Sequence, residues 1–344
     1  MLGLLRADRC PMPFRGRTRE LRQLADWLAD DRACPVLMVS GPAGVGKSRL
    51  ALEFASRLPQ GWASGWLHAG TGDMAVGAVR ACGDPAIMLV DDADGRADLV
   101  ALLESLAEQH QNPVTRVVLV TRSAVGLRAA LMSRLTERHT WVASGATQLE
   151  LDLEGGHDDQ IRWFGEAVSA FASALKGPVP ALPERFPQDQ GAAVQPFVVL
   201  QAQALLAVLG ADGDHRDPRE LPFGQLAGAL MSHEQRRWQA MAATWDWGGA
   251  PLSAMLQGRS ITALALLGAD SDADAEEILR RVSELRDASA ERLSAIGSWI
   301  AALYPASPGL APADPPGHDR GVVRRQAADR PSGTCPEPAD GTHR

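Results

Sequence analysis

The chain has 344 residues, 45% of them hydrophobic and 22% charged, with a formal net charge of -8 at pH 7. This composition is ordinary for a globular protein long enough for two domains, and the acidic balance gives no reason to expect tight binding of nucleic acid or of an anionic membrane by the whole surface. The four cysteines form no C-x-x-C pair, and no apolar run reaches the roughly 18 residues of a membrane-spanning helix, so we expect a cytoplasmic protein.

The first predicted elements are a linker, a helix and a strand. Residues 1–16 show little periodicity and are expected to be a linker. Apolar residues then recur at helical spacing between Leu21 and Leu28, and Thr18 can cap that helix. Residues 35–40 are apolar without alternation, which predicts a strand buried in a parallel sheet.

A glycine-rich loop follows that strand and fits the phosphate-binding motif G-x-x-x-x-G-K-S/T in the strand-loop-helix setting that the motif requires. Glycines let a phosphate chain lie against several backbone N–H groups at once. Lys47 can place its charge between the β and γ phosphates, and the Ser48 hydroxyl can ligate Mg²⁺. An ordinary glycine-rich turn before a helix is the alternative. The residues predicted to bind the nucleotide here are Gly41, Pro42, Ala43, Gly44, Val45, Gly46, Lys47, Ser48 and Arg49.

A second apolar run, residues 86–90, ends in two carboxylates and is typical of a Walker B strand. An aspartate at the carboxyl end of a strand beside a phosphate loop can hold Mg²⁺, and a neighbouring acid can polarise the water that attacks the γ-phosphate. We therefore predict that Asp91 is the metal-side residue and that Asp92 is the catalytic base. An aspartate-rich turn that merely opens the next helix is the alternative.

A further strand is predicted at residues 116–120 and ends at Thr121 and Arg122. A charge at that place can sense the γ-phosphate, so Arg122 joins Lys47 and Asp92 as a catalytic candidate, with a surface arginine at a strand end as the alternative. Strands and helices alternate up to about residue 153. We therefore expect an α/β fold with a five-stranded parallel sheet, in a P-loop ATPase core at residues 17–155.

Helical spacing replaces this alternation from about residue 156 onward, which predicts a helical lid at residues 156–212 and a further helical region at residues 213–304. Residues 305–344 contain eight prolines and no aromatic residue. Such a tail cannot bury enough apolar surface to offset its ordering entropy, so we expect it to be disordered.

In this order the motifs resemble the STAND group of AAA-like signalling ATPases, which includes the NB-ARC modules and related multidomain ATP-binding proteins of actinobacteria. The motifs are Phe14-Arg15-Gly16-Arg17, GPAGVGKS at 41–48, IMLVDDAD at 87–94 and VLVTRS at 118–123. The resemblance implies an ASCE-type sheet of order 5-1-4-3-2, a helical lid and a winged-helix-like region. Members of the group usually carry an effector domain and a repeat array, and this chain shows neither, so a fragment and a shortened member are both open.

The resemblance also implies roles for three further residues. It implies that Arg17 lies near the adenine pocket, that Arg122 stands at the sensor 1 position and that Pro196 is the lid proline that touches the nucleotide. The chain departs from the family pattern two residues before that proline, where Val194 replaces the usual glycine.

The first function hypothesis is therefore a slow ATPase that cycles between ATP and ADP with Mg²⁺ and serves as a signalling switch. The expected partners are the nucleotide and another protein or effector domain, with homo-oligomerisation on ATP binding left open. A DNA-handling ATPase of the origin or helicase-loader type, a non-hydrolysing nucleotide-binding scaffold and a small-molecule phosphotransferase are the alternatives. Only short basic pairs such as Arg236-Arg237 favour DNA, so neither nucleic acid nor a membrane is an expected partner.

Overall fold

The computed structural model describes residues 2–108, 114–153, 155–181, 194–210, 217–247, 249–269 and 271–304. These residues form two compact units. One unit, the sheet unit, comprises residues 22–40 and 54–149, and the other, the helical unit, comprises residues 2–21, 41–53 and those from 150 onward. The predicted disorder at 305–344 lies outside the described residues.

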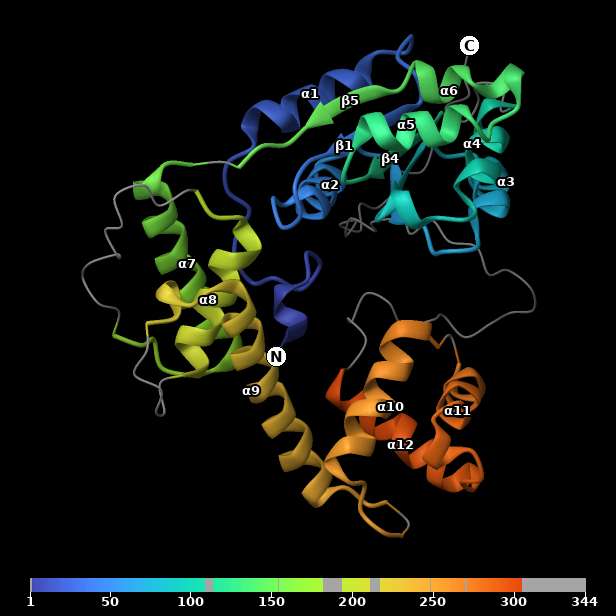
Figure 1. Ribbon diagram of the computed structural model, residues 1–344. Coiled ribbons are helices and arrows are strands. Elements are labelled where there is room, and N and C mark those ends of the chain that lie inside the picture. The colour runs from blue at the N-terminus through green and yellow to red at the C-terminus, as the bar shows by residue number, and fades with distance from the viewer. Residues whose placement is uncertain are drawn as a thin grey trace, which may run out of the picture. The chain divides into compact units, whose positions relative to one another are not determined.

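A five-stranded sheet forms the centre of the sheet unit (Figure 1). The strands are β1 (Val36–Ser40), β2 (Ala63–Trp66), β3 (Ala86–Val90), β4 (Thr115–Val120) and β5 (Thr147–Glu150). Their order across the sheet is β2-β3-β4-β1-β5, and β1 with β4, β4 with β3 and β3 with β2 pair in parallel. This is the order 5-1-4-3-2 read from the opposite edge, so the expected P-loop α/β fold is confirmed.

Burial explains why the central strands are apolar runs without alternation. Every residue of β1, β3 and β4 is buried. Alternate side chains enter one core with apolar residues of the helices α3 (Gly72–Cys82), α4 (Leu99–Ala107), α5 (Ala124–Met132) and α6 (Trp141–Ser144). Among these strand residues are Val36, Met38, Met88, Val90, Val117 and Leu119. The intervening residues are equally buried on the opposite face, as a parallel sheet covered on both faces requires.

The other regular elements of the described chain are helices. The remaining α-helices are α1 (Thr18–Ala29), α2 (Lys47–Ser56), α7 (His157–Leu175), α8 (Phe197–Leu209), α9 (Phe223–Thr244), α10 (Ala254–Leu267), α11 (Asp272–Arg280) and α12 (Ala290–Leu303). Short 3-10 helices occur at Leu2–Leu5, Ala93–Gly95, Glu137–His139, Pro218–Glu220 and Ser283–Leu285. In the part of the chain that the structure describes, none of these helices is long and apolar enough to cross a membrane.

The helical unit has two apolar cores. The first joins α7, α8 and the start of α9 to residues near the N-terminus, and the second joins the end of α9 to α10, α11 and α12 around the fully buried Trp299. The helical C-terminal part is therefore confirmed. No strand occurs in the described segments 217–247, 249–269 and 271–304, so the winged-helix likeness stays a prediction.

In this region the spacing of apolar residues predicts the end of one helix wrongly and does not indicate another helix. The apolar residues Ile278, Leu279, Val282 and Leu285 fall at helical spacing, which predicts one continuous helix face, but α11 ends at Arg280 and Leu285 lies in a separate 3-10 turn. Helix α10 was not predicted because its apolar residues do not share one face: Ile261 is buried, whereas Met255 and Leu266 are 62% and 79% exposed.

Candidate nucleotide-binding site

The loop between β1 and α2 has a backbone that requires glycine. Gly41, Gly44 and Gly46 have φ values of +144°, +75° and +97°, which side-chain-bearing residues rarely adopt. A Cβ atom at Gly41 would lie 2.3 Å from the carbonyl oxygen of Leu151, and one at Gly44 would lie 2.2 Å from Cγ1 of Val198. At Gly46 the same atom meets nothing within 4 Å among the described residues. Two of the glycines are therefore required by close packing as well as by backbone conformation.

Lys47 lies at the junction of the loop and α2. Its Nζ donates hydrogen bonds of 2.8 Å to the carbonyl oxygens of both Gly41 and Pro42. Lys47 is also the first residue of α2, and Ser48 is the second. The N-terminus of a helix of this length attracts anions through its N–H groups and its dipole. Phosphate is bound by accessible backbone N–H groups, by a positive charge and by the N-terminus of a helix. The loop offers all three, so the residues present fit a nucleotide's phosphates.

The side chain of Arg17 contacts this loop at Val45. Its side chain is 7% exposed, and Nη2 donates to the carbonyl oxygens of Val45, at 3.3 Å, and Asp152, at 2.5 Å. Nη1 is 3.3 Å from a carboxylate oxygen of Glu20. Arg17 has φ +57°, a strained conformation that persists only where several contacts hold it. These contacts are with protein carbonyl and carboxylate oxygens, and the adenine-pocket role stays a prediction.

The start of α8 contacts the same loop. The backbone N–H of Val198 donates to the carbonyl oxygen of Gly44 at 3.2 Å, and Pro196 is the N-cap residue of α8. A Cβ atom at Gly44 would also lie 3.4 Å from the Cβ of Pro196. The structure thus brings Pro196 to the loop, and its contact with a nucleotide stays a prediction.

Arg49 is engaged elsewhere with its side chain. Its guanidinium donates to the carbonyl oxygens of Ala7, at 2.6 Å, and Met12, at 3.0 Å. These bonds fasten the N-terminal segment to α2. The predicted role of Arg49 in nucleotide binding is therefore left to its backbone in the first turn of α2 and stays a prediction.

The predicted acids follow β3 in the sheet unit. Asp91 and Asp92 are exposed, and a carboxylate oxygen of Asp91 accepts the backbone N–H of Asp92 at 3.0 Å. Because β1, β4 and β3 run in parallel, their last residues lie at one edge of the sheet, with Ser40 ending β1 directly before the loop. Asp92 has φ +50°, a left-handed conformation that is uncommon outside glycine.

Asp94, which follows the two predicted acids, is a candidate site residue that sequence reasoning missed. The hydroxyl of Thr121 donates to Asp94 Oδ1 at 2.7 Å, and the backbone N–H of Arg122 donates to Oδ2 at 2.9 Å. Thr121 is buried, whereas the side chain of Arg122 is exposed. The loop after β3 is thereby tied to the end of β4. The only signal in the sequence was a third acid two residues beyond Asp92.

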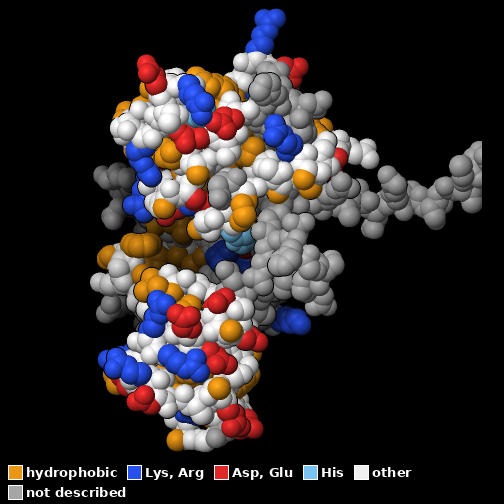
Figure 2. Space-filling view, turned by 90° about the vertical axis from the view of Figure 1, so that its right-hand side faces the viewer, with side chains coloured by type: hydrophobic (Ala, Val, Ile, Leu, Met, Phe, Trp, Pro, Cys, Tyr) orange, Lys and Arg blue, Asp and Glu red, His pale blue; other side chains and the backbone are white. Residues whose placement is uncertain are grey.

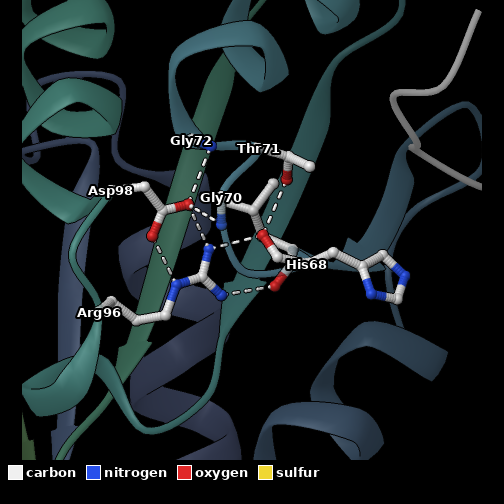
Figure 3. A network of polar contacts seen from close by, with 7 residues as sticks. His68, Gly70, Thr71, Gly72, Arg96 and Asp98 are labelled. Carbon is white, nitrogen blue, oxygen red and sulfur yellow. Dashed lines mark hydrogen bonds and ion pairs between the residues drawn. The ribbon is translucent and has the colours of Figure 1, made fainter. Parts of the chain in front are cut away.

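An ion pair ties the loop after β3 to the loop after β2 as well (Figure 3). The Nε and Nη2 atoms of Arg96 each lie 2.7 Å from one carboxylate oxygen of Asp98, so the pair is bidentate. Arg96 also donates to the carbonyl oxygens of Leu67 and His68, both at 2.7 Å. All four contacts are visible around the guanidinium in Figure 3.

Asp98 completes this network with backbone contacts. Its Oδ2 accepts the N–H groups of Gly70, at 2.9 Å, and Gly72, at 3.0 Å. The hydrogen bond from Arg96 is the main cause that lowers the pKa of Asp98 below its ordinary value. The carboxylate is therefore held in its charged form between an arginine and the start of α3.

Comparison with known proteins gives one family and several distant structures. A family model described as AAA ATPase domain matches residues 13–314. ORC1 of Aeropyrum pernix in complex with DNA is 17% identical, with 87% of this chain and 86% of that chain covered and a TM-score of 0.41. The Walker-type ATPase of Pyrococcus abyssi is 13% identical, with coverage of 84% and 90% and a TM-score of 0.40. NtrX from Brucella abortus in complex with ATP is 13% identical, with coverage of 88% and 71% and a TM-score of 0.42.

No curated protein matches the chain. Structural likenesses at this level identify no partner for it. The expectation that nucleic acid is not a partner therefore stays a prediction.

Proposed function

The chain belongs to the AAA ATPase domain family, and from that premise we propose that it is a slow, Mg²⁺-dependent ATPase that acts as a nucleotide-controlled switch of the STAND type. The observation that carries the proposal is the loop at residues 41–48, with three left-handed glycines, the ammonium of Lys47 and the N-terminus of α2. This donor set favours a nucleoside triphosphate over a neutral ligand.

Each residue of the loop has a role in this proposal. Backbone N–H groups of the loop and of the first turn of α2 bind the phosphates. Lys47 exchanges its carbonyl acceptors on Gly41 and Pro42 for phosphate oxygens, and the Ser48 hydroxyl ligates Mg²⁺. When bound, Mg²⁺ neutralises the charge that develops on the phosphate oxygens.

The acids after β3 supply the remaining chemistry. Asp91 orients the water shell of the metal, and Asp92 accepts a proton from the water that attacks the γ-phosphate. Arg122 is assigned to sensing the γ-phosphate, a role that the bond between its backbone and Asp94 supports by fixing the start of its side chain.

A switch needs an element whose position depends on the ligand. The contact of α8 with the phosphate loop supports this part of the proposal, because the N–H of Val198 and the ring of Pro196 meet the loop at Gly44. A change in the loop on γ-phosphate release alters that contact, and a partner protein or effector domain reads the result.

The charge distribution does not favour the DNA-handling alternative. On the face drawn in Figure 2, Lys and Arg side chains are interspersed with Asp and Glu. Arg280 and Arg281 form ion pairs with Glu276 and Glu277 on α11, and Arg237 pairs with Glu234. Paired arginines offer less charge to phosphates than a free basic surface does.

The test compares the purified chain with Asp92→Asn. We expect the substitution to lower kcat for ATP hydrolysis by about 10² to 10⁴ while ATP affinity changes little, because only the proton acceptor is lost. Asp26→Asn, at an exposed position of α1, is the matched control and leaves kcat unchanged. Size in solution with ADP and with a slowly hydrolysed ATP analogue tests the switch.

Two results would overturn the proposal. Full hydrolysis by Asp92→Asn removes Asp92 from the chemistry. Tight nucleotide binding without turnover in the unmodified chain makes it a scaffold instead of an ATPase.

A further inference from the structure

The loop after β3 carries the two acids of the proposed function and is anchored on both sides. It follows the middle strand of three, since β2, β3 and β4 are parallel neighbours whose carboxyl ends share one edge of the sheet. Polar contacts run from this loop to each neighbouring strand end. We call residues 91–98 the acid loop.

The anchor toward β2 is the Arg96–Asp98 pair. Their side chains are 11% and 14% exposed, so little water competes for them. Two bonds join the pair, two more run from Arg96 to carbonyls after β2, and two run from backbone N–H groups to Asp98 (Figure 3). A planar guanidinium bound on two edges fixes direction as well as distance.

Packing limits movement at this anchor. A Cβ atom at Gly72 would lie 2.6 Å from the carbonyl oxygen of Asp98 and 3.1 Å from its Oδ2. The start of α3 therefore already touches the end of the acid loop. Neither segment is free to slide toward the other.

The anchor toward β4 is Asp94. Both of its carboxylate oxygens are used, one by the hydroxyl of Thr121 and the other by the backbone N–H of Arg122. Thr121 is 1% exposed, so this contact reaches a fixed point at the end of a buried strand.

Between the two anchors and the strand lies a strained residue. Asp92 holds φ +50°, and such a conformation at a non-glycine residue persists only where its surroundings determine it. Its own backbone bonds to the Asp91 carboxylate and to the N–H of Gly95, both at 3.0 Å, supply part of this constraint, and the anchors at Asp94 and at Arg96–Asp98 hold the segment that follows.

We propose that Asp94, Arg96 and Asp98 are positioning residues that hold the acid loop in the conformation in which Asp91 and Asp92 serve Mg²⁺ and water. The proposal rests on the proposed function, because it assigns a purpose to the geometry of those two acids. It adds that the loop after β2 is part of the same rigid assembly.

The experiment uses the full chain with Asp94→Asn, Arg96→Lys and Asp98→Asn, and with Arg281→Lys as the control for an arginine-to-lysine change at an exposed ion pair. Four quantities are measured: the affinity for ADP without Mg²⁺, the tightening of ATP binding by Mg²⁺, kcat with KM, and the melting temperature. Fluorescent ATP and ADP analogues report the two binding quantities without turnover.

We expect the three variants to lose most of the Mg²⁺-dependent tightening and to lower kcat by about tenfold or more, since small misplacements of reacting groups cost rate steeply. ADP affinity without Mg²⁺ stays within about twofold of the unmodified chain, because the phosphate loop is unchanged. Arg96→Lys shows this loss although it keeps the positive charge, because an ammonium cannot reproduce the two-edged contact.

Other outcomes overturn the inference. It fails if the variants match Arg281→Lys in every quantity, or if ADP affinity, kcat and melting temperature fall together, as general destabilisation requires. If Asp98→Asn does not fold, Asp94→Asn decides, because its carboxylate is exposed and its loss leaves no buried charge. Failure of the unmodified chain to bind any nucleotide refutes the proposed function itself and is thereby distinct from these results.

Discussion

At the scale of single residues, Gly44 is the position at which two requirements coincide. It has a left-handed backbone, and its missing side chain leaves space that Val198 of α8 fills. Gly46 also has a left-handed backbone, but a Cβ atom there would meet nothing within 4 Å among the described residues. The two glycines therefore form a matched pair for separating backbone strain from packing.

We expect Gly44→Ala to destabilise the chain more than Gly46→Ala. Either alanine pays about 1–2 kcal/mol for a left-handed conformation, and at Gly44 the clash with Val198 adds roughly 1–3 kcal/mol. Urea unfolding measures both. In the double variant Gly44→Ala with Val198→Ala the 2.2 Å contact with Cγ1 is removed and only the 3.1 Å contact with the Cβ at position 198 remains, so most of the added cost disappears. Simple additivity of the two single effects would contradict this explanation.

The glycine-rich turn at residues 41–48 was predictable because its motif lies in consecutive positions, whereas its binding of phosphate stays a prediction. Asp94 and Asp98 were not predictable, since their partners are distant in sequence: Asp94 binds Thr121, and Asp98 binds Gly70 and Gly72. The side-chain contacts of Arg49 were not predictable either. Its position next to the motif gives no indication that its guanidinium binds the carbonyl oxygens of Ala7 and Met12.

At the scale of elements, the sheet was predictable because buried parallel strands leave apolar runs in the sequence. β1, β3 and β4 are of this kind. Helix α7 was predictable for a related reason, since Phe164, Val168 and Phe171 form one buried stripe. Helix α10 has exposed apolar residues at both ends, so periodicity gave no signal there.

Helix α9 offers a test at this scale, because its 22 residues contribute to both cores of the helical unit. Glu234, near its middle, is 1% exposed and accepts the hydroxyl of Tyr304 at 2.9 Å and Nη1 of Arg237 at 3.1 Å. Burial, together with the neighbouring carboxylate, raises the pKa of Tyr304 to about 12, so its hydroxyl remains a donor.

We expect Glu234→Ala to destabilise the chain by about 1–3 kcal/mol, because it leaves the partly buried donors of Tyr304 and Arg237 without their shared acceptor. Gln235→Ala, at the adjacent exposed position of the same helix, is the control and changes stability by less than about 0.5 kcal/mol. Chemical unfolding followed by tryptophan fluorescence compares them. Equal effects of the two substitutions would show that Glu234 has no special role in joining α9 to the end of α12.

At the scale of the whole molecule, each of the two compact units is built from separate stretches of the chain. Residues 2–21 and 41–53 belong by their contacts with the helices that follow residue 150, and not with the sheet. Sequence patterns locate elements, whereas this division depends on tertiary packing such as that of Met12 with Phe164 and Phe171 in one core. The domain limits at residues 17, 156 and 213 therefore remain predictions.

The central claim is that residues 41–48 bind the phosphates of ATP, and calorimetric titration of ATP into the unmodified chain and Lys47→Ala tests it most directly. A hydrogen bond from a charged donor contributes about 1.5–3 kcal/mol to the free energy of binding. We therefore expect Lys47→Ala to bind ATP about 10- to 100-fold more weakly. Lys176→Gly removes the only other lysine, at an exposed left-handed position that glycine accepts, and should bind as the unmodified chain does. Equal ATP affinity in Lys47→Ala and in the unmodified chain would contradict the account.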